Sequence, residues 1–116
     1  MYKDGEVMIL PRRYGGLCLP LWEALASGMP VLMPNISPND KVLSEEWLYK
    51  AEQQGVVTTH SDIPMYKSDV DSMIETLNNV KQNYLIANKL ARGLAESMSW
   101  AKRKPYYIKL FEEICE

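Results

Sequence analysis

The hydrophobic positions in the first third of the chain fall into short runs that turn-forming residues separate. The segment Glu6–Leu10 predicts a buried strand, and Pro30–Met33 predicts a second one. Between them, Pro20–Ser27 predicts a short helix that ends at Gly28, a residue suited to the left-handed stop of a helix. The strand–helix–strand order indicates a βαβ unit with a parallel sheet. We expect the helix to face the sheet with Leu21, Ala24 and Leu25.

The middle of the chain predicts further strands. Gly55–Thr59 is expected to be the third strand of the sheet, and Ile63–Tyr66 a short fourth whose Pro64 favours an edge position. Pro34–Leu43 is rich in turn formers and predicts a loop, while Ser44–Gln54 predicts a helix. The loop leaves the carboxyl end of a strand, where open α/β sheets bind ligands, so a ligand role stands beside that of an ordinary surface loop.

The last third of the chain predicts helices. Ser68 is expected to cap a helix whose apolar positions recur with helical spacing, and a longer helix is expected over about Lys81–Ser97. Pro105 should start or kink the last helix, and Met1–Gly5 is expected to be a helix end or a short lead-in. The chain as a whole predicts an α/β fold, a partial Rossmann-like parallel sheet of three to four strands flanked by helices. The apolar stripe of the helix after Ser68 comprises Val70, Met73, Ile74 and Leu77.

The turn before the first helix carries the candidate chemistry. Unpaired backbone N–H groups and the positive end of the helix dipole make the start of such a helix an anion site. Glu23 lies about one turn inside this helix, so the amides could hold a diphosphate while the carboxylate holds a ribose diol. On periodicity alone, a solvated helix carboxylate is the simpler interpretation of Glu23. The amides in question belong to Gly15, Gly16, Leu17, Cys18 and Leu19.

Basic residues lie beside this turn. The guanidinium groups of Arg12 and Arg13 could neutralise a diphosphate with paired hydrogen bonds, or the two residues could form a solvated surface. Tyr14 either packs over the turn or lines the pocket. His60 is the only histidine, and we expect a structural or exposed position for it because no triad or metal set surrounds it.

The segment from Gly16 to Val31 resembles the donor-site motif of retaining, nucleotide-sugar-dependent glycosyltransferases of family 4. These enzymes have the B-type fold with two Rossmann domains. The motif reads approximately E-G-F-G-L-P-x-x-E-A-x-A-x-G-x-P-V, and it is matched here by GLCLPLWEA followed by ASGMPV. Three further segments are similar to later parts of the sequences of this family. They are Gly55-Val56-Val57, Ser68–Asp71 and the end of the chain from Ser99-Trp100. The likeness covers nearly the whole chain and is strongest between about Val7 and Pro34.

The resemblance implies a function and a division of roles. It assigns the ribose contact to Glu23, whereas the family glutamate that contacts the transferred sugar is matched by Gly15, which offers no side chain. The implied reaction is transfer of a hexose from a nucleoside diphosphate sugar to an acceptor hydroxyl with retention. The donor is a substrate, and neither a metal nor another cofactor is implied. No catalytic side chain is identified.

The length of the chain limits the number of domains that it can contain. Its 116 residues suffice for one domain, which we take as a single partial nucleotide-sugar-binding domain over residues 1–116. The chain resembles the family's donor domain only from about its fourth strand, so we expect it to be either a fragment of a longer protein or a shortened relative. The strand Val7–Leu10 would then have an open edge, which favours a homo-oligomer or a partner subunit that covers it.

Composition and charge limit the classes of protein to which this chain can belong. The formal net charge of -2 does not indicate a nucleic-acid surface, and no apolar run is long enough to span a bilayer. The acidic residues near the start do not fit a signal peptide. Cys18 and Cys115 are read as reduced thiols, which together with the other features predicts a cytoplasmic location. The alternative function is a non-catalytic, truncated Rossmann-like module that acts in assembly or nucleotide binding.

Overall fold

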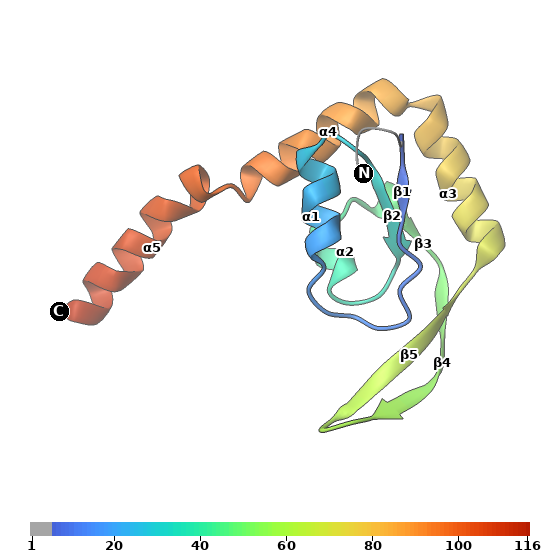
Figure 1. Cartoon of the computed structure of the whole chain (residues 1–116), viewed down its shortest axis with the longest axis horizontal. Coiled ribbons are helices and arrows are strands. Elements are labelled where there is room, and N and C mark those ends of the chain that lie inside the picture. The colour runs from blue at the N-terminus through green and yellow to red at the C-terminus, as the bar shows by residue number, and fades with distance from the viewer. Residues whose placement is uncertain (1–5) are drawn as a thin grey trace.

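A small parallel sheet lies at the centre of the molecule (Figure 1). The structure is a computed structural model that describes residues 6–116. The strands β1 (Met8–Ile9), β2 (Val31–Pro34) and β3 (Leu48–Tyr49) form this sheet in the order β1-β2-β3, with both pairings parallel. The predicted α/β fold with a parallel sheet flanked by helices is therefore confirmed. The expectation for Met1–Gly5 falls outside the described residues.

The two outer strands pair with different halves of the central strand. β1 pairs with the first half of β2, with Met8 opposite Val31, and β3 pairs with the second half, with Met33 opposite Leu48. All four residues of β2 are buried, as expected for a continuous apolar run between two strands. β1 was expected to be buried, but Ile9 is 36% exposed because β1 is an edge strand.

The first helix packs against this sheet as its sequence predicts. α1 (Leu19–Ala26) follows β1, and its core residues Leu21, Ala24 and Leu25 are buried. The chain reverses at Gly28, whose φ of 77° lies in the left-handed region that favours glycine. The helix thus ends as predicted, and β2 begins three residues later.

The segment between β2 and β3 differs from the prediction. The expected loop contains the short helix α2 (Asn39–Val42), and the helix expected over Ser44–Gln54 is absent. A 3₁₀ turn, η1 (Glu45–Trp47), leads directly into β3 instead. Trp47 and Tyr49 are both buried, and Leu48 between them is half-buried. This alternation of burial has a period of two residues, which is typical of a strand and not of a helix.

The predicted third parallel strand was wrong. Gly55–Thr59 lies mostly in β4 (Ala51–Thr58), which pairs antiparallel with β5 (Asp62–Ser68) as a hairpin separate from the central sheet. The hairpin projects away from the sheet in Figure 1. A polar stretch after Ala51 explains the difference, since it cannot be buried on both faces as a central parallel strand requires. That stretch consists of Glu52, Gln53 and Gln54, all exposed.

Two helices complete the body of the fold. The hairpin leads into α3 (Val70–Gln82), and α4 (Tyr84–Ser97) follows it across one end of the sheet (Figure 1). The N-cap of α3 is Asp69, not Ser68, and its carboxylate accepts a hydrogen bond from the Ser72 amide at 2.9 Å. The predicted apolar stripe of α3 is confirmed in part, because Met73 and Leu77 pack against the core. Val70 and Ile74 are exposed, whereas Thr76 and Val80 are buried.

Helix α4 docks on the end of α1 through polar groups. Asn88 donates from Nδ2 to the Gly28 carbonyl at 2.6 Å, and the Arg92 guanidinium donates to the Ala26 carbonyl. Ala87 and Ala91 of α4 are buried in the core beside α1. These contacts fix the α1–Gly28 corner, and with it the direction of α1 at the site described below.

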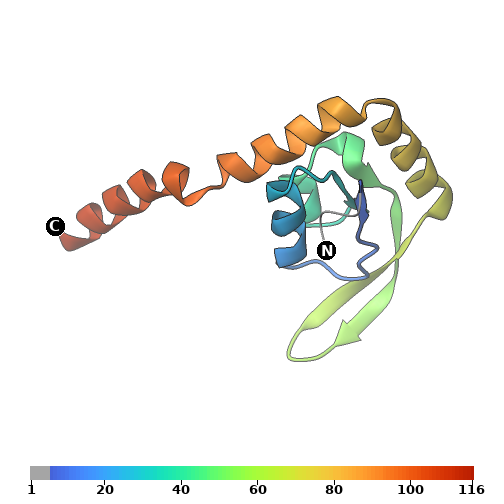
Figure 2. The same ribbon diagram turned by 45° about the horizontal axis from the view of Figure 1, so that its top comes forward.

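The last helix leaves the body of the molecule. α5 (Trp100–Cys115) extends away from the sheet, and Figures 1 and 2 both show it reaching out beyond α1 and α4. Pro105, expected to start or kink it, lies inside the helix. None of the residues of α5 is buried.

Candidate nucleotide-sugar site

The loop between β1 and α1 folds around the side chain of Arg12. The Arg12 guanidinium donates from Nη1 to the carbonyl of Gly16 at 3.1 Å and to that of Leu17 at 3.4 Å. Gly16 has a φ of 130°, a conformation that other residues rarely adopt. Arg12 therefore holds the glycine turn from inside, and its positive charge lies beside the start of α1.

Gly15 is the point where two loops meet. A Cβ atom on Gly15 would lie 2.1 Å from the Ser37 carbonyl oxygen and 3.3 Å from Cδ of Pro38. The loop that follows β1 and the loop that follows β2 thus touch at the carboxyl ends of their strands. At the position where the resemblance places a sugar-contacting glutamate, the backbone of Ser37 leaves no room for any side chain.

The start of α1 has no side-chain cap. Cys18 is the N-cap residue, with an extended backbone (φ −137°, ψ 95°), and its side chain makes no capping hydrogen bond. Pro20, in the first turn, contributes no N–H group. The first-turn amides that remain are the groups that an anion at this helix start would meet.

A cavity of about 570 Å³ adjoins this turn. It lies between α1, α2 and the end of α4, and its size is within the range of small-molecule sites. Three of the predicted site residues line it, namely Gly16, Leu17 and Cys18, whereas Arg12, Arg13, Gly15, Leu19 and Glu23 are not among the lining residues. The full lining is Gly16, Leu17, Cys18, Leu21, Trp22, Ala26, Pro38, Asn39, Val42, Ala95 and Met98.

Several lining residues were not predicted from the sequence. Asn39 is 2% exposed and donates from Nδ2 to the Pro34 carbonyl at 3.1 Å, so it ties α2 to the end of β2. The sequence did indicate a ligand role for the loop Pro34–Leu43, to which Asn39 belongs. It gave no signal for Ala95 and Met98, because their approach depends on how α4 crosses α1.

The carboxylate of Glu23 lies outside the cavity lining. Glu23 is exposed on α1 and follows Trp22, so it projects about 100° further around the helix. The buried side of α1 is formed by Leu21, Ala24 and Leu25. Glu23 is therefore placed on the outer surface of the helix, one residue beyond the edge of the cavity.

Arg13 connects the site to the hairpin. Its carbonyl oxygen accepts a hydrogen bond from the Tyr66 amide of β5 at 2.9 Å, and its side chain is exposed. Tyr14 is 40% exposed. The β1–α1 loop is thus held between the base of the hairpin and the Ser37–Pro38 backbone.

One buried tyrosine lies at the end of β3. Tyr49 is 0% exposed, and its hydroxyl is the one fully buried side-chain polar atom in residues 6–116 that lacks a hydrogen-bond partner of good geometry. Burial raises the pKa of the Tyr49 phenol, and the Ser68 side chain nearby opposes this shift only in part.

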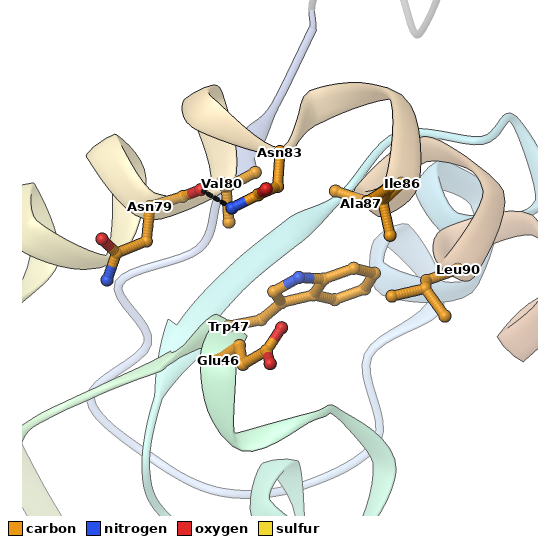
Figure 3. Close-up of a pocket in the computed structure, with 8 residues that line it drawn as sticks. All are labelled: Glu46, Trp47, Asn79, Val80, Asn83, Ile86, Ala87 and Leu90. Atoms are coloured by element: carbon orange, nitrogen blue, oxygen red, sulfur yellow. Dashed lines mark hydrogen bonds between the residues drawn. The ribbon is translucent and has the colours of Figure 1, made fainter.

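A second cavity lies away from the glycine turn. It has a volume of about 480 Å³, and Trp47 is one of the residues that line it. Trp47 immediately precedes β3 and therefore lies at the amino end of that strand. Figure 3 shows the Trp47 indole with Ile86 and Leu90 on one side and Asn79 and Asn83 across from it. The side chain of Asn83 donates from Nδ2 to the backbone carbonyl of Asn79 at 3.3 Å.

Other classes of site find less support in the described part of the chain. Residues 6–116 contain no group of three or more His, Cys, Asp or Glu side chains that could hold a metal ion. In the same residues, no helix has both the length and the apolar character needed to cross a membrane. Cys18 and Cys115 are free thiols, and His60 is exposed on the hairpin turn.

A βαβ unit with an uncapped helix start beside a cavity is the arrangement in which Rossmann-like folds commonly bind ligands. The comparison with protein families identifies the class further. A model described as "Family 4 Glycosyltransferase in conflict systems" matches residues 2–104, and the chain belongs to this family. Searches of curated proteins and of solved structures gave no significant match. The resemblance to family 4 glycosyltransferases seen in the sequence is thereby confirmed, and glycosyl transfer is the chemistry to which the family points.

Proposed function

We propose that this chain binds a nucleoside diphosphate sugar and is the donor-binding part of a retaining glycosyltransferase that transfers a hexose to a hydroxyl group. The observation that carries the proposal is the uncapped start of α1, which adjoins a cavity lined by the loops that follow β1 and β2, by α1 and by the end of α4. Membership of a glycosyltransferase family supports the same assignment.

The proposed contribution to catalysis is electrostatic. As the bond between the sugar and the diphosphate breaks, negative charge grows on the leaving diphosphate. The amides from Gly15 to Leu19 and the nearby charge of Arg12 would stabilise that charge more strongly in the transition state than in the ground state. Arg13, whose side chain is exposed beside the same loop, can add a second positive charge.

The proposed donor extends across the edge of the cavity. With its diphosphate at the turn, the nucleoside would reach over α1 toward Glu23, whose carboxylate can accept hydrogen bonds from both ribose hydroxyls. Gly15 can contribute only backbone groups, because Ser37 occupies the space beside it. The transferred sugar would therefore meet the backbone of the two joined loops.

Titration of the full chain with nucleotides tests this function. We would add UDP, GDP and their hexose conjugates and follow the amide NMR signals of Gly15 to Leu19. Glu23→Gln should weaken binding about 10- to 100-fold if the carboxylate holds the ribose, since hydrogen bonds to charged groups contribute about 1.5–3 kcal/mol. Glu75→Gln, at an exposed position of α3, is the matched control and should leave the affinity unchanged. Dissociation constants of about 10 mM or weaker for all these nucleotides would refute the proposal.

One observation favours a second candidate, a non-catalytic module that binds a nucleotide or serves in assembly. The Ser37 backbone excludes any side chain at Gly15, so the sugar-contacting carboxylate implied by the resemblance is missing. If a nucleotide sugar binds at the turn but is never consumed when an acceptor domain is supplied, this second candidate is the correct one.

The open edge of β1 supports a partner. In the described sheet β1 pairs only with β2, and Ile9 is partly exposed at that edge. A homo-oligomer or a partner subunit that covers this edge remains part of the proposal. Ile9→Lys would then reduce the association without changing nucleotide binding.

A further inference from the structure

The cavity that Trp47 lines has the size of a second binding site. Its volume of about 480 Å³ is within the range of small-molecule sites. Its walls come from η1, the end of α3 and the first half of α4. It shares no lining residue with the cavity beside the glycine turn, so a ligand bound here would leave the turn free.

The indole N–H of Trp47 is a hydrogen-bond donor without a partner. Trp47 is only 1% exposed, and its N–H donates to no group in residues 6–116. Within the same residues, the Tyr49 hydroxyl alone is both unpaired and sealed from solvent, so the Trp47 nitrogen still reaches open space. Figure 3 shows this nitrogen on the edge of the indole nearer to Asn83, within the cavity lining. Because buried tryptophan N–H groups usually have a partner, the unused donor indicates an acceptor on a ligand.

The other polar groups of the lining are acceptors. Glu46 is exposed and forms no ion pair in the described part of the chain. Asn83 uses its Nδ2 group on the Asn79 carbonyl, so its Oδ1 atom is left to accept. No lysine, arginine or histidine of the described residues lines the cavity. An anion would therefore meet the negative charge of Glu46 with no positive charge to offset it.

The remaining wall of the cavity is apolar. Ile86 and Leu90 lie beside the indole in Figure 3, and the buried residues Val80 and Ala87 complete this wall. A fitting ligand is uncharged, offers apolar C–H surface, and carries groups that both donate and accept. A primary ammonium compound lacks the acceptor that the Trp47 N–H requires.

A sugar ring meets all of these requirements, because each hydroxyl group both donates and accepts and the ring carries C–H surface. We propose that this cavity binds a neutral sugar ring, distinct from the sugar carried by the nucleotide donor. Membership of a glycosyltransferase family is consistent with this class of ligand.

NMR titration of the full chain with single sugars tests this site. The probes are glucose, galactose, mannose and N-acetylglucosamine, and the readout is the indole N–H signal of Trp47. Trp22→Phe and Trp100→Phe assign that signal among the three tryptophans of the chain. The binding efficiency usual for small ligands corresponds to a dissociation constant of about 2 mM for one hexose ring. At least one sugar should shift the Trp47 signal with an affinity of this order.

Two pairs of variants locate the binding. Glu46→Gln should weaken it about 10-fold, whereas Glu45→Gln, the neighbouring exposed glutamate outside the lining, should leave it unchanged. Ile86→Trp should fill the cavity and weaken binding at least about 10-fold. Leu85→Trp adds the same ring at the preceding position of α4, which is 78% exposed and does not line the cavity, and should have no effect.

Three results would overturn the proposal. The first is a dissociation constant of about 50 mM or weaker for all four sugars. The second is an equal loss of binding in Ile86→Trp and Leu85→Trp when both have native circular dichroism. The third is tighter binding of n-butylammonium than of any sugar, which would assign the cavity to a cation. UDP and GDP are followed at the amides of Gly16 to Cys18, so failure of the donor site is distinguishable from failure of this one.

Discussion

The contact at Gly15 allows a quantitative prediction about the site. In Gly15→Ala, the new Cβ atom would lie 2.1 Å from the Ser37 carbonyl oxygen, although carbon and oxygen atoms in contact are usually about 3.3 Å apart. The obstructing atom belongs to the backbone, so one of the two loops must move by about 1 Å. Overpacking of this kind typically costs about 1–3 kcal/mol. Because no flexible side chain can absorb the clash, we expect a cost in the upper half of that range.

Thermal unfolding followed by circular dichroism measures this cost. For 116 residues, 1 kcal/mol corresponds to roughly 4 °C, so Gly15→Ala should lower Tm by roughly 8–12 °C. Gly93→Ala is the control, because a Cβ there meets no atom within 4 Å and Gly93 lies inside α4. That variant should be more stable than wild type by up to about 1 kcal/mol. If Gly15→Ala unfolds at the wild-type temperature while Gly93→Ala is stabilised, the close contact between the two loops is refuted.

Two further substitutions have expected outcomes. Asp69→Ala removes the side chain that caps α3 at the Ser72 amide and should cost about 1 kcal/mol in urea denaturation, whereas Asp71→Ala, on the exposed first turn, should cost less. Tyr49→Phe removes a buried hydroxyl without a good partner, so the free energy of unfolding at pH 7 should stay the same or rise. The pKa of Tyr49 is raised in the folded state, so wild-type stability falls as the pH rises above the unfolded tyrosine pKa of about 10. Tyr49→Phe should show a shallower fall over that range, and identical pH profiles would contradict the argument.

The predictable part of the fold is the part encoded locally. An apolar segment, a short amphipathic helix and Gly28 predict β1, α1 and β2 closely, because each signal acts within a few residues. The hairpin was mistaken for a parallel strand because Gly55–Thr59 is apolar enough for either state. What determines its structure is its pairing with β5, which is antiparallel. The hydrophobic pattern of one segment does not reveal which strand will pair with it or in which direction.

The residues of the glycine turn could be predicted from the sequence, but the contacts that they make could not. The sequence identified the glycine turn and the start of α1, and the structure brings Gly16 to Cys18 together at a cavity. It did not reveal that Arg12 binds the carbonyls of its own turn or that Ser37 fills the space at Gly15. Both contacts depend on how two loops far apart in the sequence meet, which residue types alone do not encode. The roles of Glu23 and the turn amides in donor binding stay predictions.

The closing contact of the β4–β5 hairpin has an evolutionary consequence. The Asp69 amide donates to the Lys50 carbonyl at 2.9 Å, so the residues on either side of the hairpin are already joined before it begins. The Lys50 amide in turn donates to the Ser72 hydroxyl at 3.0 Å, which anchors that junction to α3. The arm is also joined to the β1–α1 loop, because the Tyr66 amide donates to the Arg13 carbonyl at 2.9 Å. Only the part of the arm beyond this contact can therefore be lengthened or shortened by mutation without a change in the sheet or in the first crossover.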